Sequence, residues 1–157
     1  MPDELDRRAF LVTVATSAAA CACGGCPLAT FARDRAPAAA AAPVDVGTRE
    51  DYPRDSVYDD YAKSHGFFIV RAKGRLFAPS STCTHRKTLL KVKGIAIVCP
   101  KHGARFAADG SVTKAPAKRA LPRHAVSIDD AGRITVDPSR TFAKSDWDDA
   151  ASFLPVP

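Results

Sequence analysis

The sequence predicts an all-β fold, and three observations support this prediction. Short runs of β-branched, aromatic and other apolar residues recur between residues 67 and 136. Turn-forming residues separate several of these runs, and no segment from 64 to 138 has a helical period. The 157-residue chain has room for one compact domain and a tail. We therefore expect a small antiparallel β-sandwich of roughly seven or eight strands.

Composition agrees with this size and class. Hydrophobic residues make up 46% of the chain and charged residues 25%, with a net charge of +6. These values are typical of a globular protein and unlike those of disordered or collagen-like chains. The length excludes an enzyme with separate substrate and cofactor domains.

The N-terminus has the layout of an export signal. Arg7 and Arg8 are followed at once by apolar residues, and residues 9–32 carry no charge. Gly24 and Pro27 disfavour a packed helix in this stretch. The arginine pair resembles the twin-arginine signals of bacteria, which implies export of an already folded protein.

Residues 1–35 are therefore interpreted as an export signal or membrane anchor. Three fates stay open for this segment: cleavage, lipidation at Cys21, or retention as an anchor that attaches the protein to the membrane. Residues 36–43, with the sequence APAAAAAP, suit a linker. The predicted location is the periplasm or the outer face of the cytoplasmic membrane, with the folded domain at residues 44–140.

The first predicted strands form a hairpin. Residues 67–70 (FFIV) and 75–78 (RLFA) are apolar runs joined by a short turn at Lys73-Gly74. A further apolar run at residues 95–98 (IAIV) leads directly into Cys99.

A second hairpin is predicted near the end of the domain. Residues 125–128 and 133–136 are strand-like, and residues 129–132 (DDAG) between them form turns readily. Two weak helices are expected beside the sheet, near 53–64 and 143–153. The second lies in a C-terminal tail, residues 141–157, where we expect Trp147 to pack against the domain.

Two loops each carry one cysteine and one histidine. Cys83-Thr84-His85 is followed, after 13 intervening residues, by Cys99-Pro100-Lys101-His102-Gly103. Each loop thus offers a thiolate and an imidazole close enough in sequence to reach a common centre, which makes a metal site the leading hypothesis. Gly103 lets the backbone bend closely around a buried inorganic group. His65 and His124 have no ligand-spaced partner, so we interpret them as surface or packing histidines.

The two-part motif CTH and CPKHG, followed by a two-strand hairpin, resembles the Rieske iron–sulfur family over about residues 65–137. The resemblance implies a Rieske-like β-sandwich whose two loops form a cluster-binding subdomain with one [2Fe–2S] cluster. By motif, Cys83 and Cys99 would bind one iron, and His85 and His102 the other. It implies one-electron transfer to or from a partner oxidoreductase.

The departures from the family concern the surroundings of the cluster. High-potential members carry an extra cysteine in each loop, joined as a disulfide, and this chain has none there. They also carry a serine and a tyrosine where this chain has Ala104 and Phe106. Fewer hydrogen bonds to the sulfurs predict a potential in the lower part of the roughly −150 to +300 mV Rieske range. Lys87 stands where many members have glycine, so the resemblance leaves the shape of loop one open.

Other functions stay open at this point. A Rieske subunit of a quinol–cytochrome reductase-like membrane complex would need a retained anchor and a hinge such as residues 36–43. A zinc-stabilised β interaction module would use the same four ligands. A disulfide between Cys83 and Cys99 would leave the histidines unexplained. The sequence shows no nucleophile–base pair, no mononuclear-iron triad and no nucleotide loop, so we expect an electron carrier without catalytic residues of its own.

Basic residues concentrate around the two loops. Residues 63–123 contain 14 lysines and arginines and one acid, Asp109. Those in or beside the loops are Arg86, Lys87, Lys91, Lys93, Lys101 and Arg105. Such a patch would steer an acidic redox partner, although a basic face that only keeps the protein soluble is an equal alternative. Nucleic acid is not expected, because no row of stacking aromatics is present and the predicted location is outside the cytoplasm.

Overall fold

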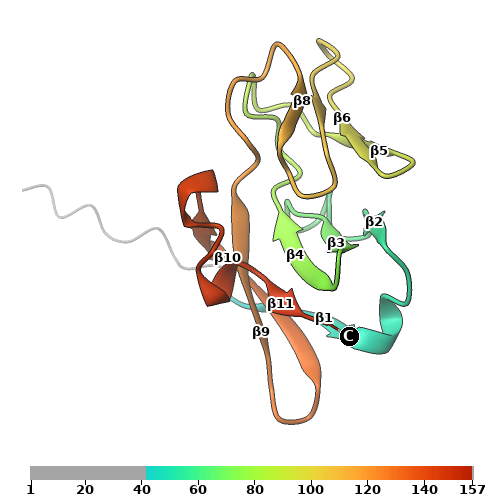
Figure 1. Cartoon of the computed structure of the whole chain (residues 1–157), viewed down its shortest axis with the longest axis vertical. Helices are drawn as coiled ribbons and strands as arrows, with labels where there is room; N and C mark the ends of the chain where they lie inside the picture. Colours follow the sequence, from blue (N-terminus) through green and yellow to red (C-terminus); the bar gives the residue numbers. More distant parts are fainter. Residues whose placement is uncertain (1–41, 157) are drawn as a thin grey trace, which may run out of the picture. The chain divides into compact units, whose positions relative to one another are not determined.

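The computed structural model describes residues 42–156, which form an all-β domain (Figure 1). The predicted fold class is confirmed. Eleven strands are present among the described residues, more than the seven or eight expected. Several of them are only two or three residues long, too short to produce a recognisable apolar run. The predicted export signal, Cys21 and residues 36–41 of the linker lie outside the described residues.

The strands form two antiparallel sheets. The larger has the order β1-β10-β9-β4-β3-β2, with β11 pairing with β4. Its strands are β1 (Val44–Thr48), β2 (Ser56–Tyr58), β3 (Ile69–Ala72), β4 (Arg75–Pro79), β9 (Arg123–Ile128), β10 (Arg133–Phe142) and β11 (Leu154–Pro155). The smaller sheet has the order β5-β6-β7-β8 and contains β5 (Lys91–Lys93), β6 (Ala96–Val98), β7 (Arg105–Phe106) and β8 (Val112–Lys114).

The β3–β4 hairpin separates two hydrophobic cores. Ile69, Leu76 and Ala78 belong to the core shared with β9 and β10, whereas Val70 and Phe77 belong to the core that extends toward the smaller sheet. Because successive side chains of a strand point to opposite faces, this hairpin is buried on both sides. Burial on both faces explains why these strands read as continuous apolar runs rather than as alternating patterns.

Both predicted hairpin turns are confirmed. Lys73 and Gly74 have φ values of 53° and 69°, the left-handed conformation that a tight two-residue hairpin turn requires of both central residues. The β9–β10 turn is held by Asp129, whose carboxylate accepts the amide N–H groups of Ala131 (3.0 Å) and Arg133 (2.8 Å). Each turn thus follows from its local residues.

The predicted helix near 53–64 is wrong. This segment contains β2, in which Val57 pairs with Val70 of β3, followed by turns. The only helical residues nearby are a short 3-10 helix, η1 (Arg49–Asp51). Strand pairing with the hydrophobic β3 stabilises an extended conformation that the short polar segment would not adopt alone.

The segment at 143–153 also lacks the single helix that was expected. It forms two 3-10 helices, η2 (Lys144–Asp146) and η3 (Ala150–Ser152). Asp149 caps η3 by accepting the amide of Ala151 at 2.8 Å, which interrupts the helical segment. After η3 the chain returns to the larger sheet as β11. No helix within residues 42–156 is long and apolar enough to span a bilayer.

Arg123 joins three parts of the domain. Its guanidinium lies 4.2 Å from the ring centre of Phe77 and 3.8 Å from that of Trp147, and it donates to the carbonyl oxygen of Asp109 at 3.0 and 3.3 Å. The expected packing of Trp147 against the domain is confirmed. Burial lowers the pKa of Arg123 to about 10, so the side chain stays charged at neutral pH. It therefore fastens the C-terminal segment and the β7–β8 loop to β4.

Replacing Arg123→Ala should lower the free energy of unfolding by about 2–4 kcal/mol, because two cation–π contacts and a buried hydrogen-bonded charge are lost together. Denaturant unfolding followed by tryptophan fluorescence measures this change. Arg140→Ala is the matched control, since Arg140 is exposed and lies 5.0 Å from one ring, that of Phe142. Equal destabilisation by the two substitutions would contradict the role given to Arg123.

Candidate metal centre

Loop one connects β4 to β5 and is closed by backbone hydrogen bonds. The amide of Cys83 donates to the carbonyl of Thr88 at 2.9 Å, and the amide of Leu90 donates to the carbonyl of Ser81 at 2.8 Å. Ser81 is itself buried and donates through its hydroxyl to the carbonyl of Ala62 at 2.7 Å. The base of the loop is therefore anchored in the domain, while its tip extends outward.

Lys87 occupies a left-handed backbone conformation at this tip. Its φ is 30°, a region that glycine adopts without steric cost and that a side chain disfavours. The loop thus has a backbone shape that suits glycine at this position, although the residue is a lysine. The departure at this position is accommodated by backbone strain.

Loop two connects β6 to β7 through a tighter turn. The amide of Cys99 donates to the carbonyl of Ala104 at 2.8 Å, and the amide of Gly103 donates back to the carbonyl of Cys99 at 3.0 Å. Gly103 has a φ of 71°, and it was singled out in the sequence for its backbone freedom. Pairing of Ile97 with Phe106 in β6 and β7 holds the two ends of the loop together.

The two cysteines meet at the base of these loops. Cys83 is 1% exposed and Cys99 is 2% exposed, and both belong to the core beside the smaller sheet. Both thiols are free, so the disulfide considered above is not formed. The Cys83 thiol is one of the groups that lower the pKa of Cys99, so the two side chains lie close together.

The surroundings of Cys99 favour a thiolate. Burial alone would raise its pKa, but the amide N–H groups of His102 and Lys101, the Cys83 thiol and the positive charge of Lys101 together lower it. These backbone donors arise directly from the tight turn of loop two. The turn therefore supports a negative charge on a sulfur atom that is almost completely buried.

The two histidines lie together at the outer side of the loops. His85 and His102 are both exposed, and their ring centres are 5.1 Å apart with the ring planes at 77°. Two imidazoles on one tetrahedral metal, with metal–nitrogen bonds of roughly 2.0–2.1 Å, have ring centres about 5 Å apart. Desolvation, followed by the charges of His85, Arg86 and Lys101, lowers the pKa of His102, which favours the neutral ring that binds metals.

These four side chains thus form two pairs rather than one cluster. Among the described residues, no three His, Cys, Asp or Glu side chains gather around a single point. A [2Fe–2S] cluster takes two protein ligands on each of its irons, so it needs ligands grouped two by two. The donor set, with soft thiolates inside and imidazoles outside, fits such a cluster.

Loop one has a further anchor that the sequence analysis missed. The hydroxyl of Thr84 donates to the carbonyl oxygen of Arg119 at 2.6 Å, across 35 positions in the chain. No residue spacing indicates this contact, because it depends on the path of the segment between β8 and β9. It ties the residue between Cys83 and His85 to a third loop.

The other candidate residues take the places expected of them. Ala104 and Phe106 are fully buried and carry no hydroxyl that could donate to a sulfur atom. His65 is exposed, whereas His124 is buried against Phe67 with its Nδ1 atom 3.1 Å from the carbonyl of Pro138. Neither lies with the four ligand-type residues, which agrees with their interpretation as surface and packing histidines.

The basic residues around the loops are exposed. None of them forms an ion pair with another residue of the described segment. They are Arg86 and Lys87 in loop one, Lys91 and Lys93 on β5, and Lys101 and Arg105 in and after loop two. Their charge is therefore available to an approaching molecule.

Comparisons with known proteins identify relatives of this chain. The family model of the Rieske [2Fe-2S] domain matches residues 42–140. The cytochrome b6-f complex iron-sulfur subunit of Chlorobaculum tepidum is 32% identical over 93 residues, which are 58% of this chain and 51% of that protein. The chain thus spans about half the length of this curated relative.

Two solved structures are also similar. The plasma membrane Rieske protein of the cyanobacterium Synechocystis PCC 6803 has 32% identity and a TM-score of 0.45, covering 60% of this chain and 98% of that one. A chain from the complex of reduced oxygenase and oxidized ferredoxin in carbazole 1,9a-dioxygenase has 20% identity and a TM-score of 0.48. That match covers 64% of this chain and 96% of the other.

Replacing Lys87→Gly should raise the free energy of unfolding by about 0.5–1 kcal/mol, because glycine removes the steric cost of a positive φ. Thermal or denaturant unfolding measures the gain. The control is Lys93→Gly on β5, an exposed lysine in extended backbone, which should lose about 0.5–1 kcal/mol. If both substitutions destabilise the domain equally, Lys87 is not strained.

Proposed function

Because the chain belongs to the Rieske [2Fe-2S] family, we propose that it transfers single electrons to or from a partner oxidoreductase. The observation that carries this proposal is the arrangement of the two loops, with a pair of buried thiols inside and a pair of exposed imidazoles outside. A [2Fe–2S] cluster bound there supplies one-electron redox chemistry. The part of the chain that the structure describes holds one such site.

Each pair of side chains has its own part in this proposal. Cys83 and Cys99 bind the inner iron, and His85 and His102 bind the outer iron. The burial of both thiols and the 5.1 Å separation of the imidazole rings support this assignment. The amides of Lys101 and His102 stabilise negative charge on the Cys99 sulfur, and the exposed imidazoles provide the edge nearest to a partner.

The proposed ligands can be tested by metal analysis of the full chain. Iron and acid-labile sulfide should be present at two of each per protein, with the EPR spectrum of mixed nitrogen and sulfur ligation after reduction. Cys83→Ser should lose the cluster, since a hydroxyl is a poor ligand for iron of this kind. The control is His124→Gln, which lies away from the loops. Zinc without sulfide would contradict the proposal and favour the zinc-stabilised interaction module.

The reduction potential is proposed to lie in the lower part of the Rieske range. Ala104 and Phe106 cannot donate hydrogen bonds to sulfur, and the described chain contains no disulfide beside the loops. A sulfur atom that accepts fewer hydrogen bonds stabilises the added electron less well. Related proteins with a serine and a tyrosine at these positions would therefore have higher potentials.

The midpoint potential of the full-length holoprotein should fall below about +200 mV. Ala104→Ser and Phe106→Tyr should each raise it, because each restores a hydroxyl near a sulfur atom. Redox titration followed by EPR or visible absorption measures the change. Val44→Thr is a control that adds a hydroxyl on β1, beside the other hydrophobic core. A midpoint well above this value, or no rise with either hydroxyl, would contradict this explanation.

An acidic redox partner is proposed from the charge around the loops. Arg86, Lys87 and Lys101 lie in the same two loops as the exposed imidazoles and have no ion-pair partner among the described residues. Opposite charges accelerate the encounter of two proteins at low salt. The basic surface therefore supports docking of an acidic protein at the histidine edge.

The rate of electron transfer to an acidic acceptor should fall as ionic strength rises, because salt screens charges beyond about 8–10 Å. Stopped-flow mixing with an acidic ferredoxin as the probe measures this dependence. Arg86→Gln combined with Lys101→Gln should flatten the salt response. The matched control, Arg54→Gln combined with Lys63→Gln, removes the same charge from exposed residues outside both loops. A response that stays equally steep in both variants would remove the steering role.

Location and assembly complete the proposal. Residues 1–35 act as a twin-arginine-like export signal or anchor, residues 36–43 as a linker, and residues 44–140 as the redox domain at the outer face of the membrane or in the periplasm. A second candidate is a subunit of a quinol–cytochrome reductase-like membrane complex. The similarity to a cytochrome b6-f complex subunit favours it, whereas the apolar residues at 104 and 106 disfavour it.

A further inference from the structure

A second cavity lies beside loop one. It has a volume of about 490 Å³, within the range of small-molecule sites. Thr84 lies on its wall, together with the cationic residues Lys118, Arg119 and Lys144. The rest of its lining is apolar: Ala120, Pro122 and Ala143. No carboxylate lines this cavity, so its charge has one sign.

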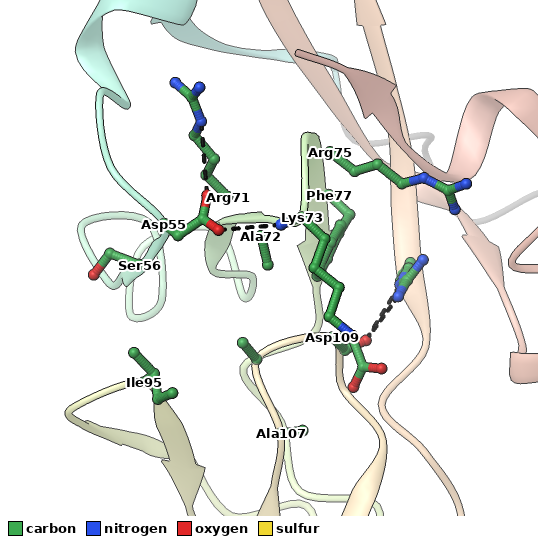
Figure 2. A pocket seen from close by; sticks show the side chains of 12 residues that line it. Asp55, Ser56, Arg71, Ala72, Lys73, Arg75, Phe77, Ile95, Ala107 and Asp109 are labelled. Carbon is green, nitrogen blue, oxygen red and sulfur yellow. Dashed lines mark hydrogen bonds and ion pairs between the residues drawn. The ribbon is translucent and has the colours of Figure 1, made fainter. Parts of the chain in front are cut away.

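Another cavity of the described domain has a different lining. It has a volume of about 610 Å³, and Figure 2 shows both basic and acidic side chains around it. Arg71 lies 3.9 Å from the Asp55 carboxylate, and Arg123 donates to the carbonyl oxygen of Asp109. Its lining therefore carries charges of both signs, whereas the lining of the smaller cavity carries positive charges only.

The walls of the smaller cavity come from distant segments held in fixed positions. Pro122 accepts a backbone hydrogen bond from Ser80 at 2.9 Å, which ties the wall to the end of β4. Phe142 of β10 pairs with Arg123 of β9, which brings residues 143–144 beside Pro122. The cavity is thus lined by three separate segments outside the strands, and their ends are held by the larger sheet.

The three cations have no ion-pair partner in the part of the chain that the structure describes. Lys118, Arg119 and Lys144 are all exposed, and all three line the cavity. Placing like charges around one space is unfavourable unless an anion occupies it. Arginine and lysine are the residue types that commonly bind oxyanions such as phosphate, and this cavity has one arginine and two lysines.

We propose that this cavity binds a dianionic oxyanion, free or as the phosphate group of a small molecule, and that its binding lowers the reduction potential of the centre. The contact of Thr84 with Arg119 connects the cavity to the ligand loop, since Thr84 lies between Cys83 and His85. A bound anion disfavours an additional negative charge nearby. This coupling rests on the proposed electron-transfer function, whereas the binding itself does not.

Calorimetric titration of the full-length holoprotein with sulfate, at constant ionic strength set by chloride, tests the binding. Arg119→Gln combined with Lys144→Gln should weaken sulfate binding at least tenfold. The matched control, Lys91→Gln combined with Lys93→Gln, removes the same charge on β5 and should bind sulfate like the unchanged protein. Phenyl phosphate distinguishes the source: tighter binding than sulfate indicates an organic phosphate, and equal binding a free oxyanion.

Redox titration with and without sulfate tests the coupling. The midpoint should fall on sulfate binding in the unchanged protein and the β5 control, and stay constant in the cavity variant. Each tenfold preference of the anion for the oxidised form corresponds to 59 mV for a one-electron couple. Absence of binding, binding without a potential shift, or an equal shift in all three proteins would overturn the proposal. A protein without iron and sulfide would refute electron transfer and leave the calorimetric result intact.

Discussion

Burial of the β3–β4 hairpin on both faces is the constraint on which the rest of the domain depends. One face of the hairpin completes the core against β9 and β10, and the other completes the core that contains both cysteines. A side chain lost from either face would leave an unfilled space in one core and weaken the support of the other, because the same two strands form both walls. The positions of loop one and loop two therefore depend on the packing of the β3–β4 hairpin.

The two pairs of side chains in the candidate centre are supported by the domain to different extents. The thiols at the base of the loops are buried in the second core, whereas the imidazoles extend beyond it into solvent. Backbone hydrogen bonds close each loop, and the contact between Thr84 and Arg119 connects loop one to the segment before β9. The inner pair is held by packing and hydrogen bonds together, and the outer pair by the short spacing between each cysteine and its histidine.

The sequence predicted what local chemistry determines. The spacing of Cys83, His85, Cys99 and His102 indicated the paired loops, and turn residues indicated both hairpins. It did not predict β2 or β11, because such short strands depend on pairing with β3 and β4 rather than on their own apolar pattern. The bond from Thr84 to Arg119 and the clustering of cations from residues 118–119 and 144 arise only when distant segments meet, so no window of sequence contains them.

The exposure of both imidazoles at one edge has a consequence for how redox partners would bind to the protein. In the proposed electron transfer, a centre enclosed by its fold on the inner side would be reached over a short distance from one direction only. Donor and acceptor would then use the same surface in turn. Tight binding of either protein would then block the other, and turnover would depend on how fast the first departs. Long-range attraction between charges, with few specific contacts, speeds the association of a partner protein without slowing its dissociation. The exposed lysines and arginines in and beside the two loops suit such brief encounters.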